Sequence, residues 1–536
     1  MRLPRASGIL LHPTSLPGRF GIGDLGPAAE AFVATLAGAG QRWWQILPVG
    51  PTGYGNSPYQ SHSSFAGNRL LLSPELLAQD GLLSPEDWRD LPHLPDDRVD
   101  FDAVTAAKDL LLRAAFARFG DGGPGFAAFR EAAAPWLDDY ALYMALKAEH
   151  GGAAWYDWEH GLVIRRPEAL EAKRTALAGE IRYQQFLQFA FARQWARLRG
   201  ICREARVGLI GDLPIFVAQD SADVWARPDL FALDERGLPT AVAGVPPDYF
   251  SDTGQLWGNP LYRWDAHEAE HYAWWIARLR GTTDRVDLVR LDHFRGFEAY
   301  WAVPAGSGTA ATGKWMSGPG NAFLDAVREG LGGLPLLAED LGEITPEVEA
   351  LRDRFALPGM RILQFAFGDD DKANDYLPFS YIPHCVVYTG THDNDTTVGW
   401  FTGSEGLTTQ PPEVKVAEKR FVRRYLGTDG SEIHWDLIRL ALGSVADTAI
   451  IPMQDLLGLG SAARMNVPGI AVGNWSWRLL PGQANDEIRE RLASLTAVYN
   501  RWVGPLPERF HRLPPEIAAK LKTKPAAEQA PTTAEA

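Results

Sequence analysis

Short apolar runs that end in a polar or acidic residue recur along the whole chain. A run that is apolar on both faces is typical of a strand in a parallel sheet whose two faces are covered by helices. We find eight such runs: Gly8–His12, Trp43–Pro48, Val207–Asp212, Val286–Asp292, Pro335–Asp340, Arg361–Phe365, Cys385–Tyr388 with its continuation Thr389–Asp393, and Ala449–Gln454. The pattern therefore predicts eight strands of one parallel sheet.

Apolar residues at helical spacing lie between several of these runs. One set predicts a helix that ends at Gly200, where glycine suits the position after a helix end: Tyr183, Phe186, Leu187, Phe191, Trp195 and Leu198. Thr345, Pro346 and Glu347 predict the start of another helix, which ends before Pro358. Eight strands with helical connections predict an α/β fold, a (β/α)8 TIM barrel.

The chain is longer than such a barrel requires. It has 536 residues, whereas a plain barrel needs about 250. We therefore expect residues 1–513 to form a barrel with inserted subdomains, the largest of them between strands 2 and 3 and between strands 3 and 4. The first spans about 50–205 and is mainly helical; the second spans about 216–266 and is rich in Pro, Gly and aromatic residues. Residues 514–536 are low in apolar side chains and are expected to be disordered.

Charge and composition narrow the choice of partners and compartment. The net charge of −15 disfavours nucleic acid and anionic membranes, which are themselves negatively charged. No stretch of eighteen apolar residues occurs, and the first residues lack the long apolar region of a signal peptide. Cys202 and Cys385 lie in apolar runs and are expected to be small buried residues. These features together predict a cytoplasmic protein.

Tryptophan is unusually frequent, with 19 residues in the chain. Large flat rings fill protein cores, and core packing is the first expectation for any single tryptophan. Such rings also stack on the apolar faces of sugars. The excess therefore mildly favours a carbohydrate partner.

Acidic residues stand at the ends of three predicted strands. Asp292 ends the fourth, Glu339 and Asp340 end the fifth, and Asp393 follows the seventh. Catalytic side chains of a TIM barrel lie at the carboxyl ends of its strands, so these acids converge on one mouth. Glycoside cleavage requires one carboxylic acid that protonates the leaving oxygen and one carboxylate that meets the anomeric carbon. Any one of these acids could instead form a turn or helix cap, but all three together favour the chemical reading.

Arg290 stands two residues before Asp292 and therefore shares its face of the strand. An arginine beside Asp292 would keep that carboxylate ionised at neutral pH. Glu339 would need the opposite, a raised pKa, in order to donate a proton. The residues alone assign no roles among the three acids.

Longer motifs make the sequence similar to a known family, the amylomaltases and disproportionating enzymes of glycoside hydrolase family 77. The resemblance runs from Ile9 to about Arg478 and rests on these segments, in order: LLHPTSLPG, WWQILPVGPTGYGNSPYQ, GDLPIFVAQDSADVW, VPPDYFSDTGQLWGNPLY, VRLDHFRG, LAEDLG, YTGTHDNDT, ARMNVPG and GNWSWR. It implies a catalytic (β/α)8 barrel with inserted subdomains. The implied activity is transfer of a 4-α-glucan segment to an acceptor sugar.

The resemblance also implies residue roles. Asp292 is the expected nucleophile, Glu339 the acid/base and Asp393 the carboxylate that stabilises the transition state. Arg290 and His392 resemble supporting residues where the bond breaks. Residues that resemble the lining of the sugar groove, a covering loop or a more distant glucan contact are Ser57, Tyr59, Gln255, Trp257, Asp340 and Asn466, then Tyr249 and Phe250, then Tyr54. For Asp212 a structural role and substrate contact are equally expected.

The expected reaction is a double displacement that retains configuration. Donors would be maltooligosaccharides or amylose, the acceptor glucose or another glucan, and cyclic glucans a further product. Neither a cofactor nor a metal is expected, and the chain is expected to be a monomer or a weak homo-oligomer. The insertion at about 216–266, which carries Tyr249 and Phe250, is expected to cover the substrate and keep water from the intermediate.

Three alternatives stay open. An amylase-like α-1,4-glucan hydrolase would use the same carboxylates. A metal-dependent barrel hydrolase is suggested by the Asp292-His293 and His392-Asp393 pairs, but the first strand offers only His12, so the ligand set is short. A glucan-binding protein without catalysis would have no need for three acids at one mouth.

Overall fold

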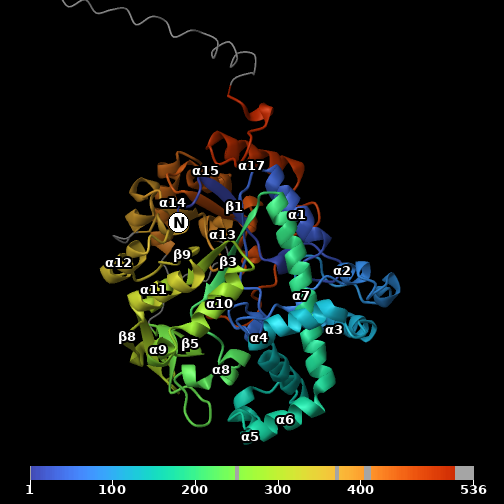
Figure 1. The fold of residues 1–536 in the computed structure, drawn as a ribbon. Helices are drawn as coiled ribbons and strands as arrows, with labels where there is room; N and C mark the ends of the chain where they lie inside the picture. Colours follow the sequence, from blue (N-terminus) through green and yellow to red (C-terminus); the bar gives the residue numbers. More distant parts are fainter. Residues whose placement is uncertain (1, 248–252, 369–372, 404–411, 513–536) are drawn as a thin grey trace, which may run out of the picture.

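The computed structural model describes residues 2–247, 253–368, 373–403 and 412–512 (Figure 1). Tyr249 and Phe250, and the tail 514–536 that was expected to be disordered, lie outside the described residues. All 19 tryptophans lie within them.

Eight parallel strands form the central sheet, as the sequence predicts. In sheet order they are β10 (Gly359–Ile362), β11 (Cys385–Tyr388), β12 (Thr448–Pro452), β1 (Ala6–Leu10), β2 (Trp43–Gln45), β3 (Gly208–Pro214), β6 (Leu288–Asp292) and β9 (Leu336–Ala338). The two ends meet, since the backbone N–H of Ala338 donates to the carbonyl of Pro358, just before β10, at 2.9 Å. The sheet is therefore a closed (β/α)8 barrel.

Helices surround this barrel (Figure 1). The helices that connect or follow the barrel strands, outside the segments between β2 and β3 and between β3 and β6 up to α9, are α1 (Pro27–Gly38), α10 (Ala273–Thr283), α11 (Gly320–Leu331), α12 (Pro346–Arg354), α13 (Thr397–Thr402), α14 (Pro412–Leu426), α15 (Ile433–Gly443), α16 (Met453–Leu456) and α17 (Asp486–Val498). The predicted start of α12 is confirmed, because Thr345 is its N-cap and Pro346 its first residue. Proline suits that position since the first N–H of a helix has no intrahelical partner.

The chain between β2 and β3 is mainly helical. Its helices are α2 (Pro74–Gln79), α3 (Phe101–Arg118), α4 (Gly123–Glu149), α5 (His160–Val163), α6 (Pro167–Ala176) and α7 (Ala178–Glu204). The predicted end of a helix at Gly200 is wrong, because α7 continues through it. The left-handed position after the helix is taken instead by Arg206, with φ 59°, and the N–H of Val207 donates to the carbonyl of Cys202. Burial of Leu198 and Cys202 on one helix face explains why the helix runs on.

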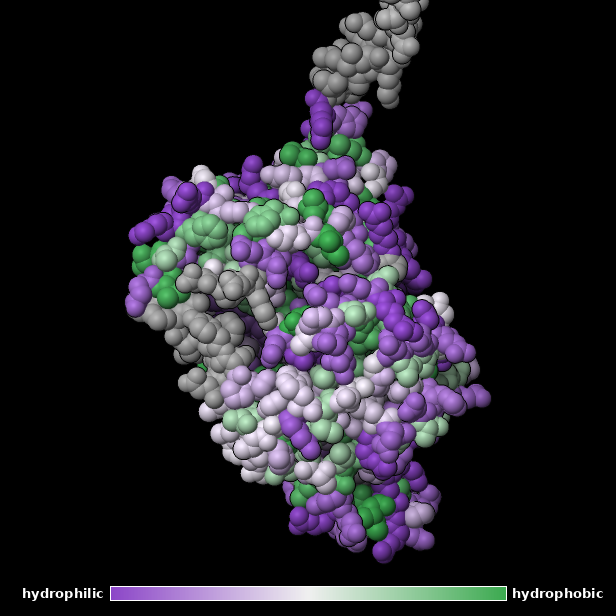
Figure 2. All heavy atoms as spheres, turned by 90° about the vertical axis from the view of Figure 1, so that its left-hand side faces the viewer, coloured by the Kyte–Doolittle hydropathy of each residue, from purple (hydrophilic) through white to green (hydrophobic). Residues whose placement is uncertain are grey.

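A second, four-stranded antiparallel sheet lies beside the barrel. Its order is β5 (Gln255–Pro260), β4 (Ala241–Val245), β7 (Ala299–Pro304) and β8 (Lys314–Ser317). The first two strands belong to the insertion after β3, which also holds α8 (Ala222–Ala226) and α9 (Trp264–Ala269), whereas β7 and β8 follow β6. The sequence did not predict this pairing. The face of the molecule that carries β8 is hollowed between its upper and lower parts (Figure 2).

The core consists of one large cluster of apolar side chains and a second, small cluster around Val104. The large cluster includes both cysteines, each buried and free. Their expected role as small buried residues is confirmed. Among the described helices, none combines the length and the apolar character that a membrane-spanning segment requires.

Arg501, near the end of the described chain, links β1 and β12, the first and last barrel strands along the chain. Its guanidinium is fully buried and donates to the carbonyl of Ala6, the first residue of β1, at 2.8 Å. It also donates to carbonyls of α15 and of the turn before β12, at Ala441, Leu442, Ser444, Ala446 and Asp447. One side chain thus satisfies backbone groups that would otherwise be buried without partners.

We predict that Arg501→Ala lowers the free energy of unfolding by about 3–5 kcal/mol, because several buried carbonyls lose their donor at once. Urea unfolding of purified protein measures this difference. Arg509→Ala is the matched control. Arg509 pairs with Glu490 at the surface, where both side chains are more than half exposed, so its loss should cost less than about 1 kcal/mol. Equal effects of the two substitutions would contradict the anchoring role of Arg501.

Candidate active site

Parallel register brings Asp292 and Glu339 to adjacent positions. Asp292 is the last residue of β6, and Glu339 directly follows β9. The two strands pair at Leu291 and Ala338, so Asp292 and Glu339 stand one step beyond this pair. Neighbouring strands lie about 4.8 Å apart, and residues at the same step share a face. The two carboxyl groups therefore meet at one edge of the barrel.

A buried ion network holds Asp292 in place. Arg290 Nη2 lies 2.8 Å from Asp292 Oδ1, while Arg290 Nη1 donates to both oxygens of Asp212, at 2.9 and 2.8 Å. Asp212 is level with Arg290 on the neighbouring strand β3. The hydroxyl of Tyr59 donates to Asp212 Oδ2 at 2.6 Å. Asp212 therefore has a structural part in the site, as a support of Arg290.

The two central carboxyl groups differ in acidity. Burial raises the pKa of Asp292 to about 6, against the opposing charge of Arg290. Burial raises the pKa of Glu339 to about 8, again opposed by Arg290, and the negative charge of Asp292 adds to the rise. Between these two values Asp292 is ionised while Glu339 keeps its proton. This is the arrangement that an acid and a nucleophile need.

Backbone groups orient the carboxyl group of Glu339. The N–H of His293 donates to Oε2 at 2.7 Å and the N–H of Leu341 donates to Oε1 at 2.9 Å. His293 has a left-handed backbone, with φ 54°, which turns the chain sharply after Asp292. Three residues on, a Cβ at Gly296 would lie 2.7 Å from Ile215 Cδ1 and 3.1 Å from the ring of His293. A larger residue at this position would therefore displace the side chain of Ile215 and press on the ring of His293.

Asp393 lies in the loop after β11, and a second loop holds it there. Asn466 Nδ2 donates to Asp393 Oδ1 at 2.6 Å, and His392 Nε2 lies 3.4 Å from Asp393 Oδ2. Arg464 ties the two loops together, because it donates to the carbonyl of Asp393 at 2.5 Å and to that of Asn466 at 2.8 Å. Arg464 was not predicted. It lies in the ARMNVPG segment that carries the family resemblance, two residues before the predicted Asn466.

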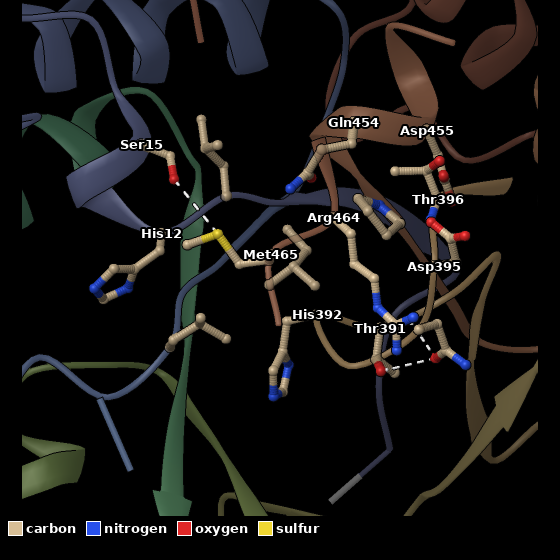
Figure 3. A pocket seen from close by; sticks show the side chains of 15 residues that line it. His12, Ser15, Thr391, His392, Asp395, Thr396, Gln454, Asp455, Arg464 and Met465 are labelled. Carbon is tan, nitrogen blue, oxygen red and sulfur yellow. Dashed lines mark hydrogen bonds between the residues drawn. The ribbon is translucent and has the colours of Figure 1, made fainter. Parts of the chain in front are cut away.

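Aromatic rings and imidazoles complete this side of the site. Tyr59 stacks on His392 with centroids 5.2 Å apart, and Trp475 packs against both rings. His12, at the end of β1, and His392 point to the same side of a pocket between β1, β12 and the loop of Asp393 (Figure 3). Burial, with the nearby His392, lowers the pKa of His12 to about 3, so this imidazole is neutral. His12 and Trp475 were not among the predicted binding residues, although His12 lies at a predicted strand end.

The other predicted binding residues lie in three places. Gln255 and Trp257 are on β5, where Trp257 Nε1 donates to Gln255 Oε1 at 3.2 Å and the Trp257 ring meets His293 edge-on at 4.8 Å. Ser57 lies in the turn before Tyr59, and its hydroxyl accepts from the Tyr59 N–H at 3.2 Å. Tyr54 is 77% exposed at the surface.

Asp340 requires a correction. It was expected to line the sugar groove, but its side chain is only 2% exposed and its Oδ2 lies 2.5 Å from Arg352 Nη1 of α12. Its Oδ1 accepts the N–H of Met360 at 2.6 Å. The reason is strand alternation, which directs Glu339 into the mouth and its neighbour outward to the helix layer. Asp340 therefore fastens α12 and β10 to the barrel.

Within the described residues, no three His, Cys, Asp or Glu side chains are grouped as a metal site would require. The Asp292-His293 and His392-Asp393 pairs therefore form no such group among these residues. His293 instead packs against Trp257, and burial lowers its pKa to about 3.

Known proteins resemble this chain in sequence and in fold. The sequence model of a family described as 4-alpha-glucanotransferase matches residues 11–483. A 4-alpha-glucanotransferase of Thermus thermophilus is 51% identical over 514 residues, which cover 94% of this chain and all of the relative. One of Synechocystis is 51% identical over 506 residues, 93% of this chain and 98% of the relative. The solved structure of an amylomaltase from Streptococcus agalactiae in complex with acarbose has a TM-score of 0.88 at 36% identity, and covers 93% of this chain and all of that chain.

We predict that Glu339→Gln changes how stability depends on pH. Because burial holds the pKa of folded Glu339 near 8, the folded state favours the protonated form. The wild type therefore loses stability as pH rises from about 4.5 to about 8, at no more than about 1.4 kcal/mol per pH unit. Glutamine cannot ionise, so the variant does not lose this stability. The unfolding free energy of the variant minus that of the wild type should therefore rise as pH rises over this interval.

Urea unfolding at several pH values between 5 and 8.5 measures this shift. Asp340→Asn serves as the neighbouring control, and it should destabilise the protein because buried Arg352 loses the charge of its partner. A difference between Glu339→Gln and wild type that stays constant with pH would contradict the raised pKa of Glu339.

Proposed function

The chain belongs to the 4-α-glucanotransferases of glycoside hydrolase family 77, and on this premise we propose that it transfers α-1,4-glucan segments by a retaining double displacement. Donors are maltooligosaccharides or amylose, and the acceptor is the 4-hydroxyl of glucose or of another glucan. The observation that carries the proposal is the pair of adjacent carboxyl groups with separated pKa values, at Asp292 and Glu339. Retaining enzymes place two such groups about 5–5.5 Å apart, close to one strand spacing.

In the first step the ionised carboxylate of Asp292 attacks the anomeric carbon of the donor. The bond from that carbon to the bridging oxygen breaks, and Glu339 gives its proton to this oxygen as the glucan fragment leaves. The products are a glycosyl ester on Asp292 and a Glu339 carboxylate. Arg290, bound to one oxygen of Asp292, keeps the nucleophile oriented and ionised.

In the second step Glu339 takes the proton of an acceptor 4-hydroxyl. The oxygen of that hydroxyl attacks the anomeric carbon, and the bond to Asp292 breaks. Two inversions restore the original configuration. Glu339 ends protonated again, so the cycle closes without a cofactor. When the acceptor hydroxyl belongs to the far end of the same amylose chain, the product is a cyclic glucan.

The remaining residues bind and orient the sugar. Asp393, held by Asn466 and His392, accepts hydrogen bonds from hydroxyls of the sugar ring whose bond is cleaved. These hydrogen bonds are stronger in the transition state than in the ground state. Tyr59 offers a ring edge beside the same sugar, with Ser57 supporting the turn before it. Trp257 and Gln255 bind on the side of Glu339. Tyr249 and Phe250 are proposed to cover the substrate, and Tyr54 to contact glucan outside the cleft.

The cellular setting is also a proposal. Two buried free thiols suit a reducing cytoplasm. A net charge of −15 gives a nucleic acid or an anionic membrane no electrostatic reason to bind. The protein is proposed to act as a monomer or weak homo-oligomer.

Maltotriose as sole substrate tests the function. We expect free glucose together with chains longer than maltotriose, while the total of reducing ends stays nearly constant, because each cleavage is matched by a new linkage. An Asp292→Asn variant should lose this activity by at least about a thousandfold, since it lacks the attacking carboxylate. Reducing ends that rise steeply without any longer chain would instead identify an α-1,4-glucan hydrolase.

Chemical rescue tests the roles within the pair. Glu339→Ala should be almost inactive on maltotriose but should still react with α-maltosyl fluoride, whose leaving group needs no proton. Added azide should then accelerate turnover and give α-maltosyl azide, since this anion needs no base. The Asp292→Ala variant is the matched control and should not be rescued to the α product. β-Maltosyl azide from Glu339→Ala would contradict the retaining mechanism.

A further inference from the structure

One tryptophan is presented to solvent on a rigid support. Trp315, on the edge strand β8, is 38% exposed, and every other tryptophan among the described residues is buried or half-buried. All four residues of β8 are exposed. A tryptophan on an exposed edge strand lowers solubility and adds nothing to the core, so core packing does not explain its presence there.

Two neighbours clamp the ring of Trp315. The guanidinium carbon of Arg295 lies 3.8 Å from the ring centroid and covers one face. Trp301, its register partner on β7, lies 5.2 Å away with the rings at 70°. Trp301 is itself fixed, because its Nε1 donates to the carbonyl of Ala310 at 2.8 Å. The exposed part of the Trp315 ring is thus held in one orientation before any ligand arrives, which lowers the entropic cost of binding.

The support leads directly to the acid/base residue. Arg295 stands three positions after Asp292, and the N–H of Phe294 between them donates to the carbonyl of Glu339 at 3.1 Å. Arg295 Nη1 donates to the carbonyl of Glu343, in the same loop as Glu339. At the far end of β8, the N–H of Gly318 donates to the carbonyl of Glu298 at 2.6 Å. Trp315 is therefore joined, through Arg295 and the turn after Asp292, to the loop that carries Glu339.

Close packing fixes β8 against this turn. A Cβ at Gly318 would lie 2.4 Å from the carbonyl oxygen of Phe297, so only glycine allows the approach. Arg295 is buried, and its Nε has no hydrogen-bond partner among the described residues. The Trp315 ring therefore compensates a desolvated cation, an interaction worth more than at an exposed site. These contacts bind the ring to the turn after Asp292 and not only to its own sheet.

We propose that Trp315, clamped by Arg295 and Trp301, is a sugar-stacking platform that extends the acceptor side of the site beyond Trp257. This rests on the proposed function, in which Glu339 acts on the oxygen of the leaving or entering chain. A ring fixed next to the Glu339 segment lies on that side of the cleavage point. The occupant is the α-1,4-glucan acceptor, whose glucose units have apolar faces that stack on an indole ring. β8 also lies on the hollowed face of the molecule (Figures 1 and 2).

Acceptor chain length is the sharpest test. α-Maltosyl fluoride at saturating concentration serves as donor, and glucose and maltopentaose serve as acceptors for wild type and three variants. Trp315→Ala should raise KM for maltopentaose about tenfold, while KM for glucose stays within about twofold, because glucose does not reach the platform. The kcat should change little with either acceptor. Trp315→Phe should recover most of the affinity, since it restores a flat ring.

Met316→Ala is the matched control. Met316 is also 38% exposed and is the next residue on β8, so its side chain lies on the opposite face of the strand. This variant should keep the wild-type KM for both acceptors. Transfer to glucose by each variant also reports that the protein is folded.

Three results would overturn the platform. They are an unchanged maltopentaose KM in Trp315→Ala, an equal rise of KM for glucose and maltopentaose, or the same length-dependent rise in Met316→Ala. The second result would show that Trp315 positions the turn next to Glu339. The third would show that the effect comes from a loss of stability of β8. Failure of the proposed function looks different, because the wild type itself would then form no transfer product with either acceptor.

Discussion

One buried arginine between two carboxylates sets the chemistry of this site. Arg290 bonds to Asp212 on one side and Asp292 on the other, and Glu339 stands one strand away. Two neighbouring carboxylates in a partly desolvated site are costly to ionise together, because each negative charge raises the pKa of the other. Asp292 contacts the cation directly, so Glu339 is the group that keeps its proton. The proposed division into nucleophile and acid follows from the position of this positive charge.

The barrel supplies this placement through strand register. Asp212, Arg290 and Glu339 all face the mouth because β3, β6 and β9 are parallel and aligned, and a shift by one residue would turn any of them outward. Asp340 shows the outward alternative, since it stands next to Glu339 and yet binds Arg352 in the helix layer. The loop of Asp393 has no such register to fix it. Side chains of a second loop, above all Arg464 and Asn466, hold the Asp393 loop in place instead.

The sequence predicted what depends on local pattern and missed what depends on distant pairing. All eight barrel strands and the three acids could be found, because apolar runs and their terminal residues are local signals. The helix end at Gly200 was misplaced, since burial of Cys202 outweighs the preference of glycine. Strand alternation could have separated Glu339 from Asp340. The sheet that joins β4 and β5 to β7 and β8 across a barrel strand leaves no comparable trace in the sequence. Arg464 lies in the ARMNVPG segment, but its bonds to the carbonyls of Asp393 and Asn466 depend on how two loops meet.

Transfer and hydrolysis share the first step, so the carboxylates alone cannot choose between them. In the proposed double displacement, the choice is made when either water or a sugar hydroxyl attacks the ester on Asp292. Water is far more concentrated, so a transferase must raise the local concentration of acceptor at Glu339 by binding it nearby. In our proposal, rings fixed on the Glu339 side bind the acceptor at low entropic cost. Trp257 packs on His293, and Trp315 lies over Arg295. Both rings therefore rest on the turn that follows the nucleophile. If these rings bind the acceptor as we propose, the backbone that orients Glu339 also positions the acceptor, so that the incoming hydroxyl is aligned with its base.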